Sequence, residues 1–171
     1  FMLFFVPISS KAFESQTITI YSEPSDGISK FLGSSGVHSW LDVRNNETGN
    51  QCFVNQSRYY KGILAAFNPK NDGVFAISRS FFAFDTSIFD DNVTISRAFF
   101  YLYGVGANES RVCVVSWMDG KDGLDYDDFG FTGSTSFGIS RPWKINQYNA
   151  IELNEHGKDT INTKGYTYLC C

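Results

Sequence analysis

An acidic stretch over residues 119–128 has the residue types that come closest to a metal site. It reads DGKDGLDYDD, and the carboxylates that could supply hard oxygen ligands are Asp122, Asp125, Asp127 and Asp128. Calcium favours several such oxygens on a flexible loop. The spacing departs from the EF-hand loop, because the fifth and twelfth positions counted from Asp125 are Phe129 and Ser136. We therefore expect a solvated acidic turn, with a calcium site as the alternative, and no other cofactor.

The chain offers little that could support catalysis. Its two histidines, His38 and His156, lie in expected loops. Neither a nucleophile elbow nor a glycine-rich phosphate loop accompanies them. Paired carboxylates for glycosidic cleavage depend on a separation that only the fold sets. We predict that the protein is not an enzyme.

Tryptophan side chains could serve as platforms for sugar rings. The chain has three, at Trp40, Trp117 and Trp143. Trp117 lies in an apolar run and is more typical of a buried core, whereas Trp143 follows Arg141-Pro142 and is the better candidate for an exposed ring. The 17 Phe and nine Tyr also fit a bulky core. Trp143 is therefore the predicted carbohydrate contact.

Four cysteines without Cys-x-x-Cys spacing favour disulfides over a thiolate metal site. They are Cys52, Cys113, Cys170 and Cys171. A bond between the adjacent pair would close a strained ring, and neighbours on a strand point to opposite faces. We expect Cys52 and Cys113 each to pair with one of the last two cysteines. Four buried thiols are the alternative.

Four Asn-x-Ser/Thr sequons fall in expected turns and loops, where a glycan is tolerated. Their asparagines are Asn46, Asn55, Asn92 and Asn108. Together with an even set of cysteines, they favour an exported glycoprotein.

The first eight residues, FMLFFVPI, are almost wholly apolar and precede the alternating pattern that begins at Gln16. An exposed segment of this kind needs a partner. The favoured interpretation is a strand donated to a neighbouring subunit, which would build a head-to-tail fibre. The alternatives are a first strand in the chain's own domain and a signal peptide cleaved after Ser10-Lys11-Ala12. The donated residues would be Phe1, Met2, Leu3, Phe4, Phe5, Val6 and Ile8.

The elements that position these groups are predicted to be strands. Residues 79–104 form two of them, joined by the turn Asp90-Asp91-Asn92. Residues 80–84 are an apolar aromatic run, and residues 95–103 alternate. One face of the second strand would carry Ala98, Phe100 and Leu102, and the other Arg97, Phe99, Tyr101 and Tyr103. Such strands need a second sheet to cover them, which predicts a β-sandwich.

Further strands are expected at residues 16–21, 40–43, 51–54, 59–67, 111–117, 149–153 and 165–170. A short helix is predicted over residues 154–162, with Asn154 as its cap and Ile161 facing inward. Repeats and linkers are not evident. We predict a hydrophobic N-terminal extension over residues 1–14 and one β-sandwich domain over residues 15–171.

The strand pair resembles the core of DNRLRE-type domains, which are also grouped as carbohydrate-binding modules of family 96. The matching segments are RSFFAFDTS at 79–87 and ISRAFFYLY at 95–103, followed by DYD at 125–127, YNAIELN at 148–154 and the region from Ile161 to Leu169. The resemblance covers about residues 17–171 and implies a secreted, jelly-roll-like, all-β sandwich of antiparallel strands. The family's closing Leu-Arg is here Leu169-Cys170.

Charge and length narrow the functional classes. At 171 residues the chain has the size of one domain. A net charge of −4 without a basic cluster argues against nucleic acid and anionic membranes, and no stretch is long enough to span a bilayer as a helix. We predict a secreted cell-surface subunit of an extracellular filament that carries N-glycans and pairs with identical subunits. The alternative is a secreted module that binds polysaccharide.

Overall fold

The computed structural model describes ten ranges of the chain, and its contacts divide the chain into two compact units. The described residues are 4–9, 15–22, 26–34, 37–54, 65–68, 74–90, 93–104, 113–117, 123–140 and 142–171. The first unit comprises Phe1–Glu23, Ala83–Ser116 and Ser134–Leu169, and the second comprises Pro24–Phe82, Trp117–Gly133 and Cys170–Cys171. The predicted division into residues 1–14 and 15–171 stays a prediction.

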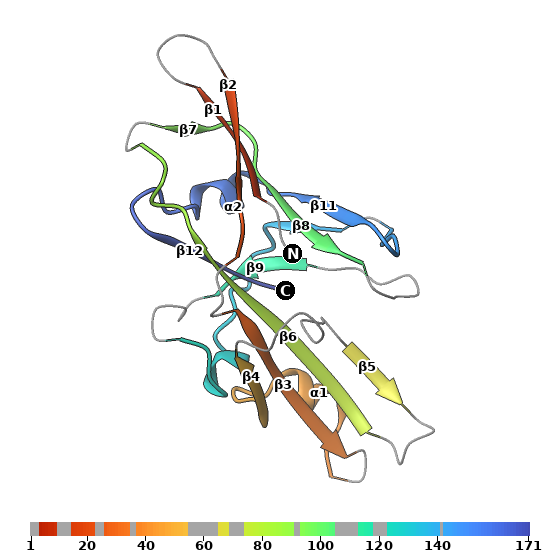
Figure 1. The fold of residues 1–171 in the computed structure, drawn as a ribbon. Helices are drawn as coiled ribbons and strands as arrows, with labels where there is room; N and C mark the ends of the chain where they lie inside the picture. Colours follow the sequence, from red (N-terminus) through yellow and green to blue (C-terminus); the bar gives the residue numbers. More distant parts are fainter. Residues whose placement is uncertain are drawn as a thin grey trace. The chain divides into compact units, whose positions relative to one another are not determined.

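The protein is all-β, as the sequence predicts, and its strands pair antiparallel. In the first unit one sheet has the strand order β11-β8-β1-β2, and β7 also pairs with β1 (Figure 1). The bounds are β11 Tyr148–Glu152, β8 Phe99–Tyr103, β1 Phe4–Ser9, β2 Ser15–Ile20 and β7 Thr94–Ile95. A second set of neighbours is β10 (Gly138–Ile139), β9 (Cys113–Ser116) and β12 (Tyr166–Cys170). The jelly-roll topology stays a prediction.

Strand β8 has the two faces that its alternation predicts. Phe100 is fully buried, and its ring meets that of Phe84 edge-on with centroids 6.3 Å apart. Phe84 belongs to β6 (Val74–Asp85), which is longer than the predicted apolar run and passes from the second unit into the first. Ile151 of β11 is buried as well. The inward side chains of β8 therefore hold the strand in the core, and its outward side chains are not needed for that packing.

The apolar segment at the start of the chain pairs within its own chain. The backbone of β1 pairs with β2 on one side and with β7 and β8 on the other. Residues Phe1, Met2 and Leu3 lie outside the described ranges. The structure thus shows the arrangement that the intramolecular alternative expects, and insertion into a neighbour stays a prediction.

In its described residues, the second unit has four strands and two short helical elements. The strands are β3 (Gly27–Ser34), β4 (Gln51–Val54), β5 (Ala65–Asn68) and most of β6, and the helical elements are α1 (Trp40–Arg44) and η2 (Asp127–Phe129). Phe31, Val43, Ile77 and Phe129 form its core cluster.

The predicted strand over residues 40–43 is wrong, because this segment is helix α1. Ser39 caps the helix: its hydroxyl accepts from the Asp42 backbone N–H, and the Asp42 carboxylate accepts from the Ser39 N–H. This reciprocal capping box satisfies two otherwise unpaired donors, which outweighs the strand preference of the apolar residues.

The predicted helix near residues 154–162 is confirmed as α2, which spans Glu155–Asp159. The Asn154 side chain accepts from the Gly157 backbone N–H at 3.0 Å, and Ile161 is buried. Within the described residues, the helices are too short and too polar to cross a bilayer.

Candidate functional site

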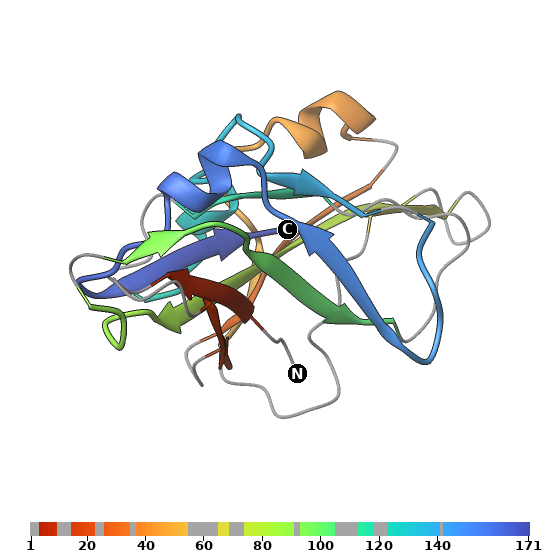
Figure 2. The same cartoon turned by 90° about the horizontal axis from the view of Figure 1, so that it is seen from above.

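A row of aromatic side chains lies on the outward side of β8 and continues onto β11. We call Phe99, Tyr101, Tyr103 and Tyr148 the aromatic face. Tyr103 and Tyr148 are direct cross-strand partners, each 46% exposed, and their rings meet edge-on at 5.2 Å. Phe99 and Tyr101 are half-buried, with ring centroids 6.1 Å apart. The two strands can be followed in green and blue in Figure 2. Together they present rings to solvent where polar side chains are more usual.

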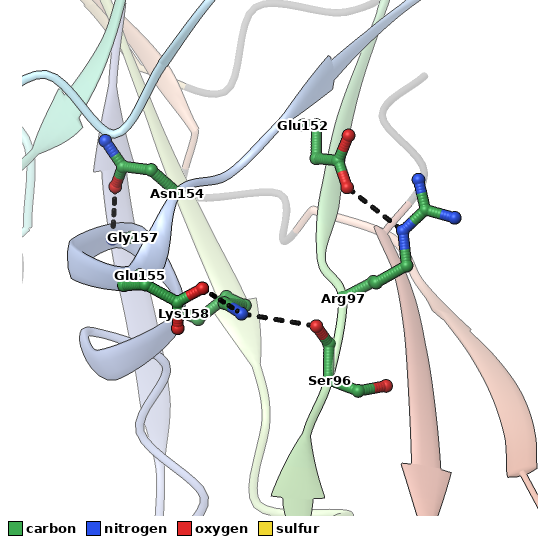
Figure 3. A network of polar contacts seen from close by, with 7 residues as sticks. All are labelled: Ser96, Arg97, Glu152, Asn154, Glu155, Gly157 and Lys158. Carbon is green, nitrogen blue, oxygen red and sulfur yellow. Dashed lines mark hydrogen bonds and ion pairs between the residues drawn. The ribbon is translucent and has the colours of Figure 1, made fainter.

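An ion pair closes one end of the aromatic face. The guanidinium of Arg97 lies 4.7 Å from the centroid of the Phe99 ring. Its Nε donates to Glu152 Oε1 at 3.0 Å, and Glu152 is the cross-strand partner of Phe99. Both charged side chains are more than half exposed. This end of the face therefore combines the Phe99 ring with a cation and an anion that neutralise each other. Figure 3 draws the ion pair of Arg97 and Glu152.

Helix α2 holds the segment that carries Arg97. The Lys158 ammonium donates to the Ser96 carbonyl at 3.2 Å and pairs with Glu155 at 2.8 Å. The Lys158 side chain is only 15% exposed, whereas that of Glu155 is 83% exposed. The Leu153 backbone N–H also donates to the Ala98 carbonyl at 2.9 Å. These contacts, three of whose residues Figure 3 draws, fix the chain immediately before β8.

The other end of the face is fixed by the buried side chain of Asn149. Its Oδ1 accepts from the Lys144 backbone N–H at 2.7 Å, and its Nδ2 donates to the carbonyls of Lys144 and Gln147 at 2.9 and 3.2 Å. Asn146 in this turn has a φ of 58°. A Cβ at Gly104 would lie 2.1 Å from the Lys144 carbonyl oxygen, so only glycine fits there. The turn before Tyr148 is therefore preorganised.

Trp143 lies in the same unit as the aromatic face, next to the residue that follows Tyr103. It is half-buried rather than fully exposed, and its Nε1 would be 2.9 Å from a Cβ at Gly104, the residue after Tyr103. Trp117 is 3% exposed and packs on Phe81, which confirms its core assignment. The alternation of residues 95–103 predicts that Phe99, Tyr101 and Tyr103 share one face, but it does not mark that face as a site. The available signal was an aromatic ring at every second position from Phe99 to Tyr103.

The acidic turn uses its carboxylates to hold itself together. Asp128 is 2% exposed and accepts from Trp117 Nε1 and from the Asp125 backbone N–H. Asp125 Oδ1 accepts from the Asp127 backbone N–H at 2.8 Å. No group of three or more metal-ligating side chains occurs within the described ranges, and Asp122 lies outside them. The described part of the turn is thus a structural element.

The predicted disulfides are not formed, although all four cysteines fall within the described ranges. Cys52 Sγ donates to the Leu124 carbonyl at 3.7 Å, and Cys113 Sγ donates to Ser136 Oγ at 3.2 Å. These two thiols thus have other partners than Cys170 and Cys171. Burial raises the pKa of Cys52, and the negative charges of nearby Asp125 and Asp128 raise it further.

One of the four sequons can be placed. Asn46 is half-buried, and its Oδ1 accepts from the Thr48 backbone N–H at 3.2 Å. Asn55, Asn92 and Asn108 lie outside the described residues. N-glycosylation stays a prediction.

Of the two histidines, His38 packs edge-on against Phe31, and His156 is exposed on α2.

Comparison of the chain with protein-family models, with curated proteins and with solved structures finds no match. The resemblance to DNRLRE-type domains stays a prediction.

Proposed function

We propose that this protein is a secreted carbohydrate-binding domain and that the aromatic face is its binding surface. The observation that carries the proposal is the exposed ring pair of Tyr103 and Tyr148 at the preorganised end of β8 and β11. A tyrosine ring offers an apolar surface together with a hydroxyl, which suits the apolar ring faces and hydroxyl rims of sugars.

Preorganisation supports the proposal. Asn149 and Gly104 fix the turn before Tyr148, and the contacts of Lys158 and Leu153 fix the residues before β8. A site on rigid elements loses little conformational entropy on binding, so modest ring contacts retain more of their free energy. Sugar binding depends on such savings because sugars carry few apolar groups.

The test is a binding panel of soluble neutral and acidic polysaccharides, read by affinity electrophoresis. The double variant Tyr103→Ala/Tyr148→Ala should lose binding by more than about tenfold, as expected when two central rings are removed from a contact surface. Tyr166→Ala is the matched control, because Tyr166 is similarly exposed at 42% but lies on β12. Equal binding by the double variant and the wild type would exclude the aromatic face.

Assembly into an extracellular filament is the second candidate function. It is favoured by the place of β1, which is flanked by β2 on one side and by β7 and β8 on the other. The same strand of a neighbouring copy could occupy that place with the same register, and main-chain hydrogen bonds would hold the subunits together. In such an exchange β1 would keep the register that it has within one chain.

Crosslinking distinguishes a β1 strand that pairs within its own chain from one that is supplied by a neighbouring copy. Ile8 of β1 and Ile95 of β7 are register partners, so Ile8→Cys/Ile95→Cys places two cysteines within reach of a disulfide. Exchange between copies should give a ladder of covalent multimers on a non-reducing gel, and the single variant Ile8→Cys should not. A product that runs only as a monomer would reject the filament.

A further inference from the structure

We infer that Glu152 sets the specificity of the aromatic face for neutral over acidic polysaccharides by neutralising Arg97. The inference rests on the proposed function and names its ligand class. The Arg97 guanidinium stacks on the Phe99 ring at one end of the aromatic face. Its Nε donates to the Glu152 carboxylate at 3.0 Å.

The geometry of the row fits an extended polymer. Alternate positions along a strand lie about 7 Å apart, so Phe99, Tyr101 and Tyr103 span about 14 Å along one face of β8. That length accommodates consecutive sugar rings. Arg97 lies just before the strand and stacks on Phe99. Tyr148 widens the row at the Tyr103 end, where it is the cross-strand partner.

The charges along the row explain the preference. At one end the positive charge of Arg97 is cancelled by Glu152, and both groups are solvent-exposed. An acidic polymer would meet the Glu152 carboxylate next to the Arg97 guanidinium and be repelled by it, whereas a neutral polymer has no charge to be repelled. At the other end Lys144 is exposed on the turn, and its charge is present with or without Glu152.

The test replaces Glu152 with a neutral side chain of the same shape. Glu152→Gln should raise the affinity for polygalacturonate about fivefold, the effect of one exposed charge interaction of about 1 kcal/mol. The gain should disappear at high salt, because exposed charges are screened, and in the double variant Arg97→Gln/Glu152→Gln. Glu47→Gln is the matched control: it makes the same charge change at an exposed glutamate of the second unit.

The outcomes separate this inference from the proposed function. A gain in Glu152→Gln alone supports it. Equal gains in Glu152→Gln and Glu47→Gln, or no gain in either, overturn it while leaving intact any neutral binding that depends on Tyr103 and Tyr148. If the wild type binds no neutral polysaccharide through those two tyrosines, the proposed function fails as well.

Discussion

Two turns of this molecule are each held by one buried polar side chain, but the first turn leaves an aromatic ring exposed and the second contacts a buried one. Asn149 binds the backbone around Lys144 and leaves Tyr148 exposed beside Tyr103. Asp128 binds Trp117 and the Asp125 backbone, and Trp117 is buried. In the first turn the buried polar side chain fixes the backbone next to two exposed rings. In the second turn the buried polar side chain stabilises the turn itself.

The comparison shows why composition is a poor guide to a binding site. The acidic turn has the more conspicuous residues, yet the carboxylates of Asp125 and Asp128 accept hydrogen bonds from the backbone of the turn or from Trp117. The aromatic face looks like core in the sequence, yet four of its rings reach the surface. The partner of each group, rather than its residue type, decides whether it is available to a ligand.

The largest effect is expected from Asp128→Ala. The variant loses the hydrogen bonds that the Asp128 carboxylate accepts from the indole N–H of Trp117 and from the Asp125 backbone N–H. This loss should lower the free energy of unfolding by about 3 kcal/mol. Urea denaturation measures the change. Asp127→Ala, at an exposed position of the same turn, is the control and should cost less than about 0.5 kcal/mol. Similar losses for both variants would show that the turn does not depend on Asp128.

Asn149→Ala should have the next largest effect. The variant loses the amide that bonds Lys144 and Gln147, which should cost about 2 kcal/mol. Because the same amide fixes the turn before Tyr148, polysaccharide binding should weaken together with stability. Unchanged binding in a folded Asn149→Ala protein would mean that the turn need not be preorganised.

The thiol of Cys52 reports on the acidic turn with a smaller effect. Its pKa is raised by burial and then by Asp125 and Asp128, so Asp125→Asn should lower that pKa and increase the thiolate fraction at a given pH. Alkylation of Cys52 should become about twofold faster. The measurement is made in a Cys113→Ser background by mass spectrometry, with the protein that keeps Asp125 in the same background as the control. An unchanged rate would mean that the Asp125 charge does not reach the thiol.

The smallest effect is expected from calcium. A ligand that binds only the folded state raises the melting temperature. Because the Asp125 and Asp128 carboxylates already accept backbone and indole hydrogen bonds, millimolar calcium should shift the melting temperature by less than about 1 °C. Magnesium at the same ionic strength is the control. A clear rise in the melting temperature with calcium but not with magnesium would support a calcium site in the acidic turn.

The period-2 pattern of β8 made much of the first unit predictable. Alternation fixes which residues share a face, so the sequence predicts that Phe100 and Tyr103 lie on opposite faces of the strand. Asn154 likewise identified α2, because a cap acts on the next three residues. Both features depend on neighbours in the sequence.

Long-range pairing could not be read in the same way. Tyr148 meets Tyr103 across 45 residues of chain through the register of β11 on β8, and no local pattern encodes that register. The same holds for the cysteines, whose expected pairing relied on local arguments: the strain of a bond between adjacent residues and the opposite directions of neighbours on a strand. Helix α1 was missed for another reason: its apolar residues suggested a strand, although Ser39 and Asp42 already formed a capping box in the sequence.

The most direct test of the aromatic face is an NMR titration with a neutral oligosaccharide chosen from the binding panel. Backbone amide shifts should move at residues 97–104 and 143–152 and stay unchanged at residues 123–130. Shifts confined to the acidic turn, or no shifts at residues 97–104 and 143–152 with a saccharide that binds, would contradict the account.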